Sequence, residues 1–141
     1  MKQSAERVFL DANVLFSAAY GSPGLRKLWD LAAKGLCELY ASAYAIEGAR
    51  LNLERQEHLT RLGELLARAT LLPEADPQTP CPVSLSPEDR PILLAAIQAA
   101  TTHLVTGDLH HFGAYLGQVV GGVAICTPRD YLSRHRRAAN T

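Results

Sequence analysis

The stretch VFLDANVLF, residues 8–16, places an aspartate between two apolar segments of different character. Residues 7–10, Arg-Val-Phe-Leu, predict a short buried strand, and Asp11 follows it. The apolar residues that follow predict a helix as far as about Tyr20. In an α/β domain this arrangement puts an acid at the carboxyl end of a strand, where ligands bind.

Strand and helix signals alternate along the rest of the chain, and five prolines between residues 73 and 87 predict a long loop. This alternation predicts one α/β domain over residues 1–141, with a central, mainly parallel sheet of four to five strands and helices on both faces. The expected strands are 7–10, 36–40, 70–72, 104–106 and 123–125, and the expected helices are 12–20, 25–33, 42–57, 59–69, 86–100 and a short one after residue 128.

The composition is that of a globular protein, with 48% apolar and 20% charged residues. No apolar run approaches the roughly 20 residues that cross a bilayer, and MKQSAERVFL lacks the long apolar region of a signal peptide, so we expect a cytoplasmic protein without a membrane anchor. Cys37, Cys81 and Cys126 are odd in number and widely spaced, which argues against a disulfide framework and a zinc site.

Fourteen basic and fourteen acidic residues cancel, so the net charge gives no sign of a nucleic-acid partner. Basic residues nevertheless crowd the carboxyl-terminal segment. They could hold a phosphate backbone or an acidic partner, or belong to a solvated, frayed terminus. These residues are Arg129, Arg134, His135, Arg136 and Arg137.

Two acids are expected at strand ends. Asp11 follows the first strand and Asp108 follows the fourth, in HLVTGDLHHF (residues 103–112). Because parallel strands end at the same edge of a sheet, we expect the two carboxylates to be neighbours although 97 positions separate them. Alternatively, Asp11 caps the following helix and Asp108 is a turn residue.

Two further acids are expected on helices that could aim them at the same edge. Asp89 lies in SPEDRPILLAAI (86–97), although Ser86 and Asp89 also resemble a capping box. Glu47 lies in SAYAIEGARLNL (42–53), where it could instead pair with Arg50 on a solvated helix.

Four clustered carboxylates require a cation. Two of them about 4 Å apart repel by roughly 4 kcal/mol at an effective dielectric constant near 20, so an uncompensated cluster would protonate or separate. Oxygen ligands favour the hard ions Mg²⁺ and Mn²⁺. Such an ion activates water and stabilises a leaving oxygen, so the implied reaction is phosphodiester hydrolysis.

The four acidic segments, together with ICTPRDYL (125–132), resemble the motifs of the PIN-domain nucleases, a family that includes toxins of toxin–antitoxin pairs. The resemblance implies a Rossmann-like α/β/α sandwich and Mg²⁺- or Mn²⁺-dependent cleavage of single-stranded or structured RNA. It also implies that Asp11, Glu47, Asp89 and Asp108 are the catalytic, metal-binding quartet.

Three neighbouring positions extend the resemblance or depart from it. Asn13 and Thr106 match polar positions that orient the first and fourth acids, although ordinary strand-end hydrogen bonding would explain them equally well. Many relatives carry a further acid soon after the position of Asp108, whereas His110 and His111 stand here. These histidines could bind the scissile phosphate or donate a proton, or they could be exposed loop residues.

The resulting hypothesis is an endoribonuclease toxin, one half of a type II toxin–antitoxin pair, that a small antitoxin inactivates. The apolar surface of the first helices could form a homodimer or receive the antitoxin. The alternative is a PIN-like module that binds RNA or protein without cutting. A phosphatase with Asp11 as its nucleophile is disfavoured, because it would require a second aspartate at the position of Asn13.

Overall fold

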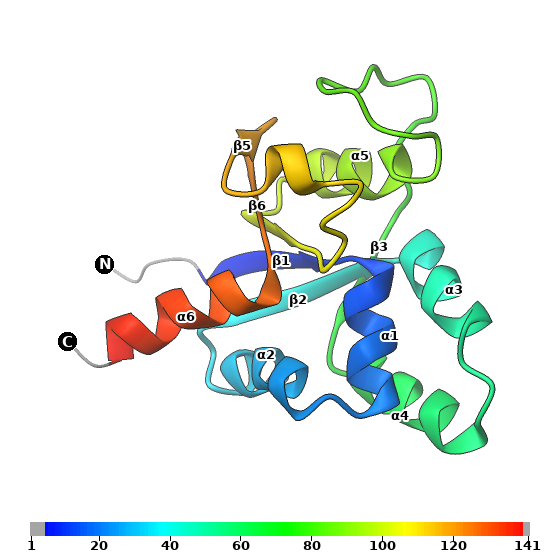
Figure 1. Cartoon of the computed structure of the whole chain (residues 1–141), viewed down its shortest axis with the longest axis vertical. Coiled ribbons are helices and arrows are strands. Elements are labelled where there is room, and N and C mark those ends of the chain that lie inside the picture. Colours follow the sequence, from blue (N-terminus) through cyan, green and yellow to red (C-terminus); the bar gives the residue numbers. More distant parts are fainter. Residues whose placement is uncertain (1–4, 140–141) are drawn as a thin grey trace.

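The computed structural model describes residues 5–139, which form six strands and six α-helices in largely alternating order (Figure 1). The strands are β1 (Glu6–Leu10), β2 (Cys37–Ser42), β3 (Thr70–Leu72), β4 (His103–Val105), β5 (Val119–Val120) and β6 (Val123–Cys126). The helices are α1 (Ala12–Tyr20), α2 (Pro23–Ala33), α3 (Ala43–Leu51), α4 (Gln56–Leu66), α5 (Arg90–Gln98) and α6 (Pro128–Ala139), with a 3₁₀ turn at Gly113–Tyr115.

The strands form one sheet in the order β3-β2-β1-β4-β6-β5. All neighbouring pairs are parallel except β5 with β6. The predicted α/β class and mainly parallel sheet are therefore confirmed, with β5 as one strand more than expected. Gly121 and Gly122 both have positive φ and join β5 to β6 in a tight hairpin, a conformation that glycine adopts without strain.

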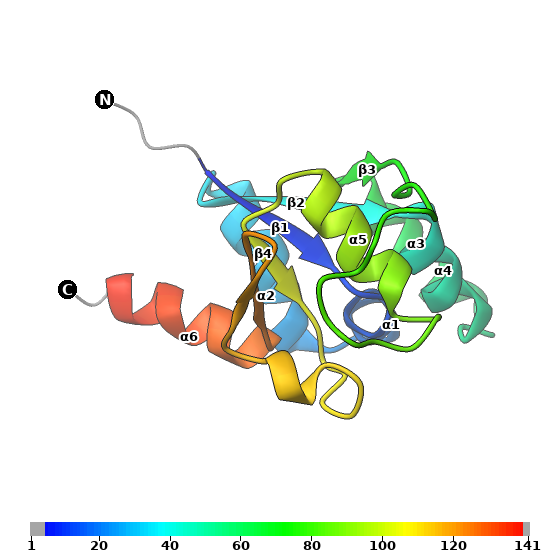
Figure 2. The ribbon, with the colours of Figure 1, turned by 90° about the horizontal axis from the view of Figure 1, so that it is seen from above.

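Helices cover both faces of the sheet, which gives the predicted three layers. Helix α5 lies on one face and α1 and α2 lie on the other, as the two perpendicular views show (Figures 1 and 2). The central strand β1 supplies three residues with no exposed surface, Val8, Phe9 and Leu10. On the α1 and α2 side the buried indole of Trp29 donates a 3.0 Å hydrogen bond to the carbonyl oxygen of Leu65.

Most of the expected helices have other bounds, and α2 and α4 begin two and three residues earlier than expected. The continuous helix 42–57 is wrong, because α3 ends at Leu51 and the Asn52 side chain donates to the Gly48 carbonyl at 3.0 Å. Helix α5 begins at Arg90 instead of in the turn at Ser86, whose hydroxyl donates to Asp89 instead of accepting a backbone hydrogen bond. Helix α6 has 12 residues and is not short.

The remaining expectations concern the cysteines, the basic segment and the membrane. All three cysteines are free, and Cys37 is buried. The basic segment forms α6 instead of a frayed end, although the side chain of Arg137 lies outside the described residues. Within residues 5–139 no helix has both the length and the apolar character needed to cross a bilayer.

Candidate metal centre

The strand order brings two of the predicted acids together. Strand β1 pairs with β2 on one side and with β4 on the other, so the chain changes direction across the sheet at the β1–β4 boundary. Asp11 follows β1, and its backbone N–H donates to the carbonyl oxygen of Val105 at the end of β4, 3.1 Å away. Asp108 follows β4. Ligand sites of open α/β sheets form at such a boundary.

Neutral donors hold the carboxylate of Asp11, which is only 5% exposed. Oδ1 accepts from the backbone N–H of Ala12 at 2.7 Å, so the predicted capping role is real. Oδ2 accepts from the hydroxyl of Thr106 at 2.8 Å and from the side-chain amide of Asn13 at 3.1 Å. Each carboxylate oxygen can accept about two hydrogen bonds, so Oδ1 keeps a free lone pair.

Thr106 and Asn13 link the two strand ends, as expected of residues that orient the acids. The fully buried hydroxyl of Thr106 donates to Asp11 and accepts from the backbone N–H of Asp108 at 3.0 Å. The side-chain oxygen of Asn13 accepts from the backbone N–H of Gly107 at 2.7 Å. A Cβ atom at Gly107 would lie 3.2 Å from that oxygen, so glycine permits the close approach.

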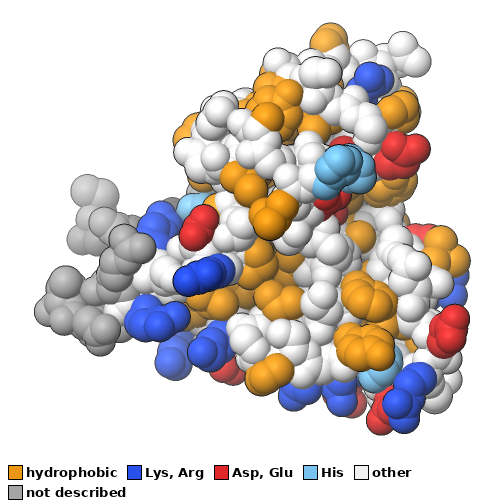
Figure 3. Space-filling model, in the orientation of Figure 1, with side chains coloured by type: hydrophobic (Ala, Val, Ile, Leu, Met, Phe, Trp, Pro, Cys, Tyr) orange, Lys and Arg blue, Asp and Glu red, His pale blue; other side chains and the backbone are white. Residues whose placement is uncertain are grey.

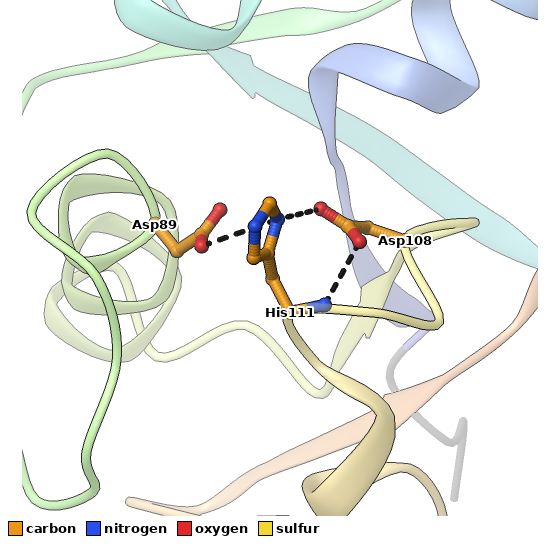
Figure 4. A group of neighbouring side chains, drawn as sticks. All are labelled: Asp89, Asp108 and His111. Atoms are coloured by element: carbon orange, nitrogen blue, oxygen red, sulfur yellow. Dashed lines mark hydrogen bonds and ion pairs between the residues drawn. The ribbon is translucent and has the colours of Figure 1, made fainter.

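Asp89, Asp108 and His111 form the tightest group of possible metal ligands among the described residues (Figure 4). One ligand atom of each lies within 4.8 Å of the others. The ring nitrogen Nδ1 of His111 lies 2.6 Å from Asp108 Oδ2 and 3.6 Å from Asp89 Oδ2. The backbone N–H of His111 also donates to Asp108 Oδ1 at 2.9 Å. The imidazole thus lies between the two carboxylates, in a position that suits a cation.

The protonation equilibria at the site reflect burial and this contact. Burial raises the pKa of Asp11, and its three hydrogen bonds offset only part of that effect. Burial also acts to raise the pKa of Asp108, but hydrogen bonds from the backbone and ring of His111 bring the pKa below its ordinary value. The hydrogen bond with Asp108, followed by the charge of Asp89, raises the pKa of His111.

Glu47 lines the same cavity, but its carboxylate is paired with an arginine and not with the other acids. It is exposed and forms an ion pair with Arg50, three residues further along α3. That hydrogen bond lowers the pKa of Glu47. Gly48 allows α3 to approach the start of α1, since a Cβ atom at Gly48 would lie 3.1 Å from the Cβ of Ala12. Glu47 and Asp11 therefore line the cavity but lie outside the group of three whose ligand atoms come within 4.8 Å of one another.

All four predicted acids line one cavity of about 450 Å³, together with Asn13 and His111. Sequence reasoning missed two features of this cavity. Glu88 also lines it, which makes five acids, and His111 lies against the carboxylates instead of in open solvent. Figure 3 shows histidine and acidic side chains side by side at this surface. Of the two histidines, His110 is exposed and its ring centroid lies 5.0 Å from that of His111.

The donor set fits a divalent cation. Among the residues that line the cavity, His111 is the one side chain that can carry positive charge, against five acids. Carboxylate oxygens with one imidazole nitrogen are a suitable ligand set for a divalent metal ion. The fold and these candidate metal ligands at the carboxyl ends of β1 and β4 define a class, the α/β domains with an acidic centre at a strand-order switch.

Comparisons with known proteins give the family. The sequence profile of the PIN domain matches residues 7–110, well over half of the chain, so the chain belongs to the PIN-domain family. The fold is similar to VapBC2 from Rickettsia felis bound to a DNA fragment from its promoter, with a TM-score of 0.61, 13% identity and coverage of 86% of this chain and 98% of that one. It is also similar to FitAB bound to the IR36 DNA fragment, with a TM-score of 0.53, 20% identity and coverage of 86% and 94%. No curated protein matches the sequence significantly.

Proposed function

We propose that the chain is a Mg²⁺- or Mn²⁺-dependent endoribonuclease and the toxin of a type II toxin–antitoxin pair. The observation that carries the proposal is the cavity in which Asp11, Asp89 and Asp108 meet with one partly exposed histidine as the nearest counter-charge. Membership of the PIN-domain family supports the reaction class, because that family is typically composed of nucleases.

Each residue of the cavity has its own role in the proposed reaction. Asp11, Asp89 and Asp108 would hold the ion, and Glu47 lines the same cavity. The bound cation would lower the pKa of a water molecule and neutralise charge on the phosphate oxygens. Thr106 and Asn13 fix Asp11, and Thr106 also holds the backbone of Asp108, so that these carboxylates do not need to reorganise.

The reaction is a hydrolysis. The oxygen of water forms a bond to phosphorus, the bond from phosphorus to the leaving sugar oxygen breaks, and that oxygen takes up a proton. His111 lines the cavity and the exposed His110 lies next to it, so both are near enough to contact the phosphate of an RNA strand.

The antitoxin is the second partner in this proposal. Figure 3 shows apolar side chains over α1. Tyr20 is 60% exposed there, and its ring packs against those of Phe16 and His58, at centroid distances of 5.6 and 4.4 Å. An exposed aromatic patch of this kind is typical of a protein-binding surface. The similarity to VapBC2 and FitAB supports a partner protein of the antitoxin type.

The test is cleavage of a fluorescent single-stranded RNA by the purified protein with Mn²⁺, with Mg²⁺ and with EDTA. We expect cleavage with either metal and none with EDTA. Asp108→Asn should abolish it, whereas Asp30→Asn, which removes the same charge from the exposed face of α2, should not. Intact RNA in the presence of Mn²⁺ and folded protein would overturn the proposal.

That outcome would favour a PIN-like module that binds RNA or protein without cutting. One observation supports this second candidate. Asp108 and Glu47 already have cationic partners within the chain, His111 and Arg50.

A further inference from the structure

A second cavity, of about 520 Å³, opens beside the acidic centre between α2, α6 and the loop that follows β4. Its lining combines leucines with basic side chains. We call it the α2–α6 groove. It is formed mainly by Leu25, Lys27, Leu109, Arg129, Leu132 and Arg136.

The basic residues of α6 are divided between two faces of the helix. Arg129, Leu132 and Arg136 are spaced three and four residues apart, so they share the face that lines the groove. Arg134 and His135 instead bind Glu6. Figure 3 shows basic side chains over α6 next to apolar ones.

The positive charge of the groove is uncompensated. None of its lining residues is acidic. Within the part of the chain that the structure describes, Lys27, Arg129 and Arg136 form no ion pair. Unpaired cations on a concave surface attract a polyanion.

The groove continues directly from the acidic centre. Gly107 and Leu109 line it, and Asp108 lies between them in the chain. The cavity on the other side of the centre, about 820 Å³, has the opposite character, because Glu47, Glu74 and Asp76 line it against a single arginine, Arg90. A polyanion that reaches Asp108 is therefore drawn towards α6 and repelled from the proline-rich loop.

We propose that the α2–α6 groove binds the backbone of single-stranded RNA next to the phosphate that is cut. Lys27, Arg129 and Arg136 contact its phosphates, and the leucines of the groove pack against unpaired bases. Proteins hold single strands with a positively charged groove that follows the backbone and with side chains that contact unpaired bases, whereas a duplex keeps its bases paired and out of reach. This inference rests on the proposed function and names where its substrate lies.

The test compares two double variants of the full chain. Lys27→Gln with Arg129→Gln removes two charges from the groove, and Lys34→Gln with Arg55→Gln removes two exposed charges outside it. Binding of a labelled 12-nucleotide RNA is measured by fluorescence anisotropy in EDTA, so that cleavage cannot interfere, over a series of salt concentrations.

The groove variant should bind about tenfold more weakly at low salt, and the slope of log K against log salt should fall in magnitude by about 1.4, which is two phosphate contacts for a single strand. The control variant should behave as the wild type. Equal slopes for the two variants would overturn the inference, as would tighter binding of a deca-aspartate peptide than of RNA through the same residues.

Hydrolysis of bis(p-nitrophenyl) phosphate with Mn²⁺ separates the two proposals. This small diester does not reach the groove, so the groove variant should retain the wild-type rate while its KM for RNA rises. If the wild type cleaves no substrate but the groove variant loses RNA binding, the nuclease proposal is refuted and the proposal for the groove stands. If the wild type cleaves RNA but the groove variant binds RNA as tightly as the wild type, the proposal for the groove is refuted and the nuclease proposal stands.

Discussion

The two ends of strand β1 each carry a partly or fully buried acid, and the acids have opposite surroundings. Glu6 at the start of β1 accepts hydrogen bonds from Tyr131 and His135, at 2.9 and 2.8 Å, and from Arg134. Burial acts to raise the pKa of Glu6, but these partners bring it below its ordinary value. Asp11 beyond the other end has only neutral donors, and its pKa is raised by burial and by the charge of Asp89.

This difference separates an acid that is compensated within the chain from one that is not. The charge of Glu6 is compensated by the guanidinium of Arg134, and Tyr131 and His135 add hydrogen bonds, so it needs no partner from outside. The hydrogen bonds of Asp11 position its carboxylate without neutralising it, and Asp89 and Asp108 add further negative charge nearby. Burial of unpaired charge is costly, so the carboxyl end of the sheet is prepared for an external cation.

The largest expected effect comes from removing the charge at each end of β1. Asp11→Asn should lower the rate of metal-dependent RNA cleavage by about 100-fold or more, or ~2.7 kcal/mol of transition-state stabilisation. Glu6→Gln should leave cleavage unchanged and lower the free energy of unfolding by about 1–2 kcal/mol, because it weakens charge-assisted hydrogen bonds. Initial cleavage rates measure the activity of each variant, and urea unfolding curves measure its stability. Equal losses of cleavage activity in Asp11→Asn and Glu6→Gln would show that the two acids do not differ in role.

The next effect tests the positioning of Asp11 by neutral donors. Thr106→Val keeps the shape of a fully buried side chain but removes its hydrogen bonds to Asp11 and Asp108. We expect Mn²⁺ affinity, measured by isothermal titration calorimetry, to fall by about 10- to 100-fold. Thr106→Ser retains the hydroxyl and should restore most of the affinity. Unchanged affinity in the valine variant would mean that Thr106 does not orient the site.

The sequence predicted the strand-end half of the site because its geometry follows from topology. Once β1 and β4 are parallel neighbours, Asp11 and Asp108 must meet at one edge of the sheet. The hydroxyl and amide of Thr106 and Asn13, two residues away from those acids, could be foreseen as their partners.

The parts that sequence did not predict depend on loops and short elements. His111 reaches Asp108 only because residues 108–112 form a turn in which its backbone N–H also bonds Asp108. Strand β5 has two residues, too few for an alternating pattern to be visible. The break after α3 depends on the side chain of Asn52, which bonds back to Gly48 and ends the helix.

A smaller effect is expected at Glu47, which lies at the carboxyl end of the sheet but resembles Glu6 in having a cationic partner. Because Glu47 is paired with Arg50, Glu47→Gln should lower the cleavage rate by about tenfold, less than Asp11→Asn. Glu57→Gln is the matched control, since Glu57 is also exposed and paired with an arginine, Arg55, but lies on α4. A loss as large as that of Asp11→Asn would place Glu47 among the metal ligands.

The smallest effect is the pH dependence of stability at the amino end of β1. Burial lowers the pKa of His103 below its ordinary value of 6.5, and the charges of Arg134 and His135 act in the same direction, while Glu6 opposes them. The unfolded chain therefore takes up a proton at His103 before the folded protein does. The stability that His103 contributes is complete above about pH 6.5 and is lost as the pH falls towards its folded pKa.

Urea unfolding of the wild type and of His103→Gln at pH 7.5 and pH 5.5 isolates this term, because other titrating groups, His111 included, are common to both proteins and cancel in the difference. The wild type should lose more stability than the variant on acidification. The ring of Tyr131, whose centroid lies 5.1 Å from that of His103, limits the solvation of the imidazole and so also lowers the pKa of His103. A greater acid sensitivity in His103→Gln would mean that Glu6 stabilises the protonated imidazole more than burial penalises it. The negative charge of Glu6 would then not be fully compensated by its other partners.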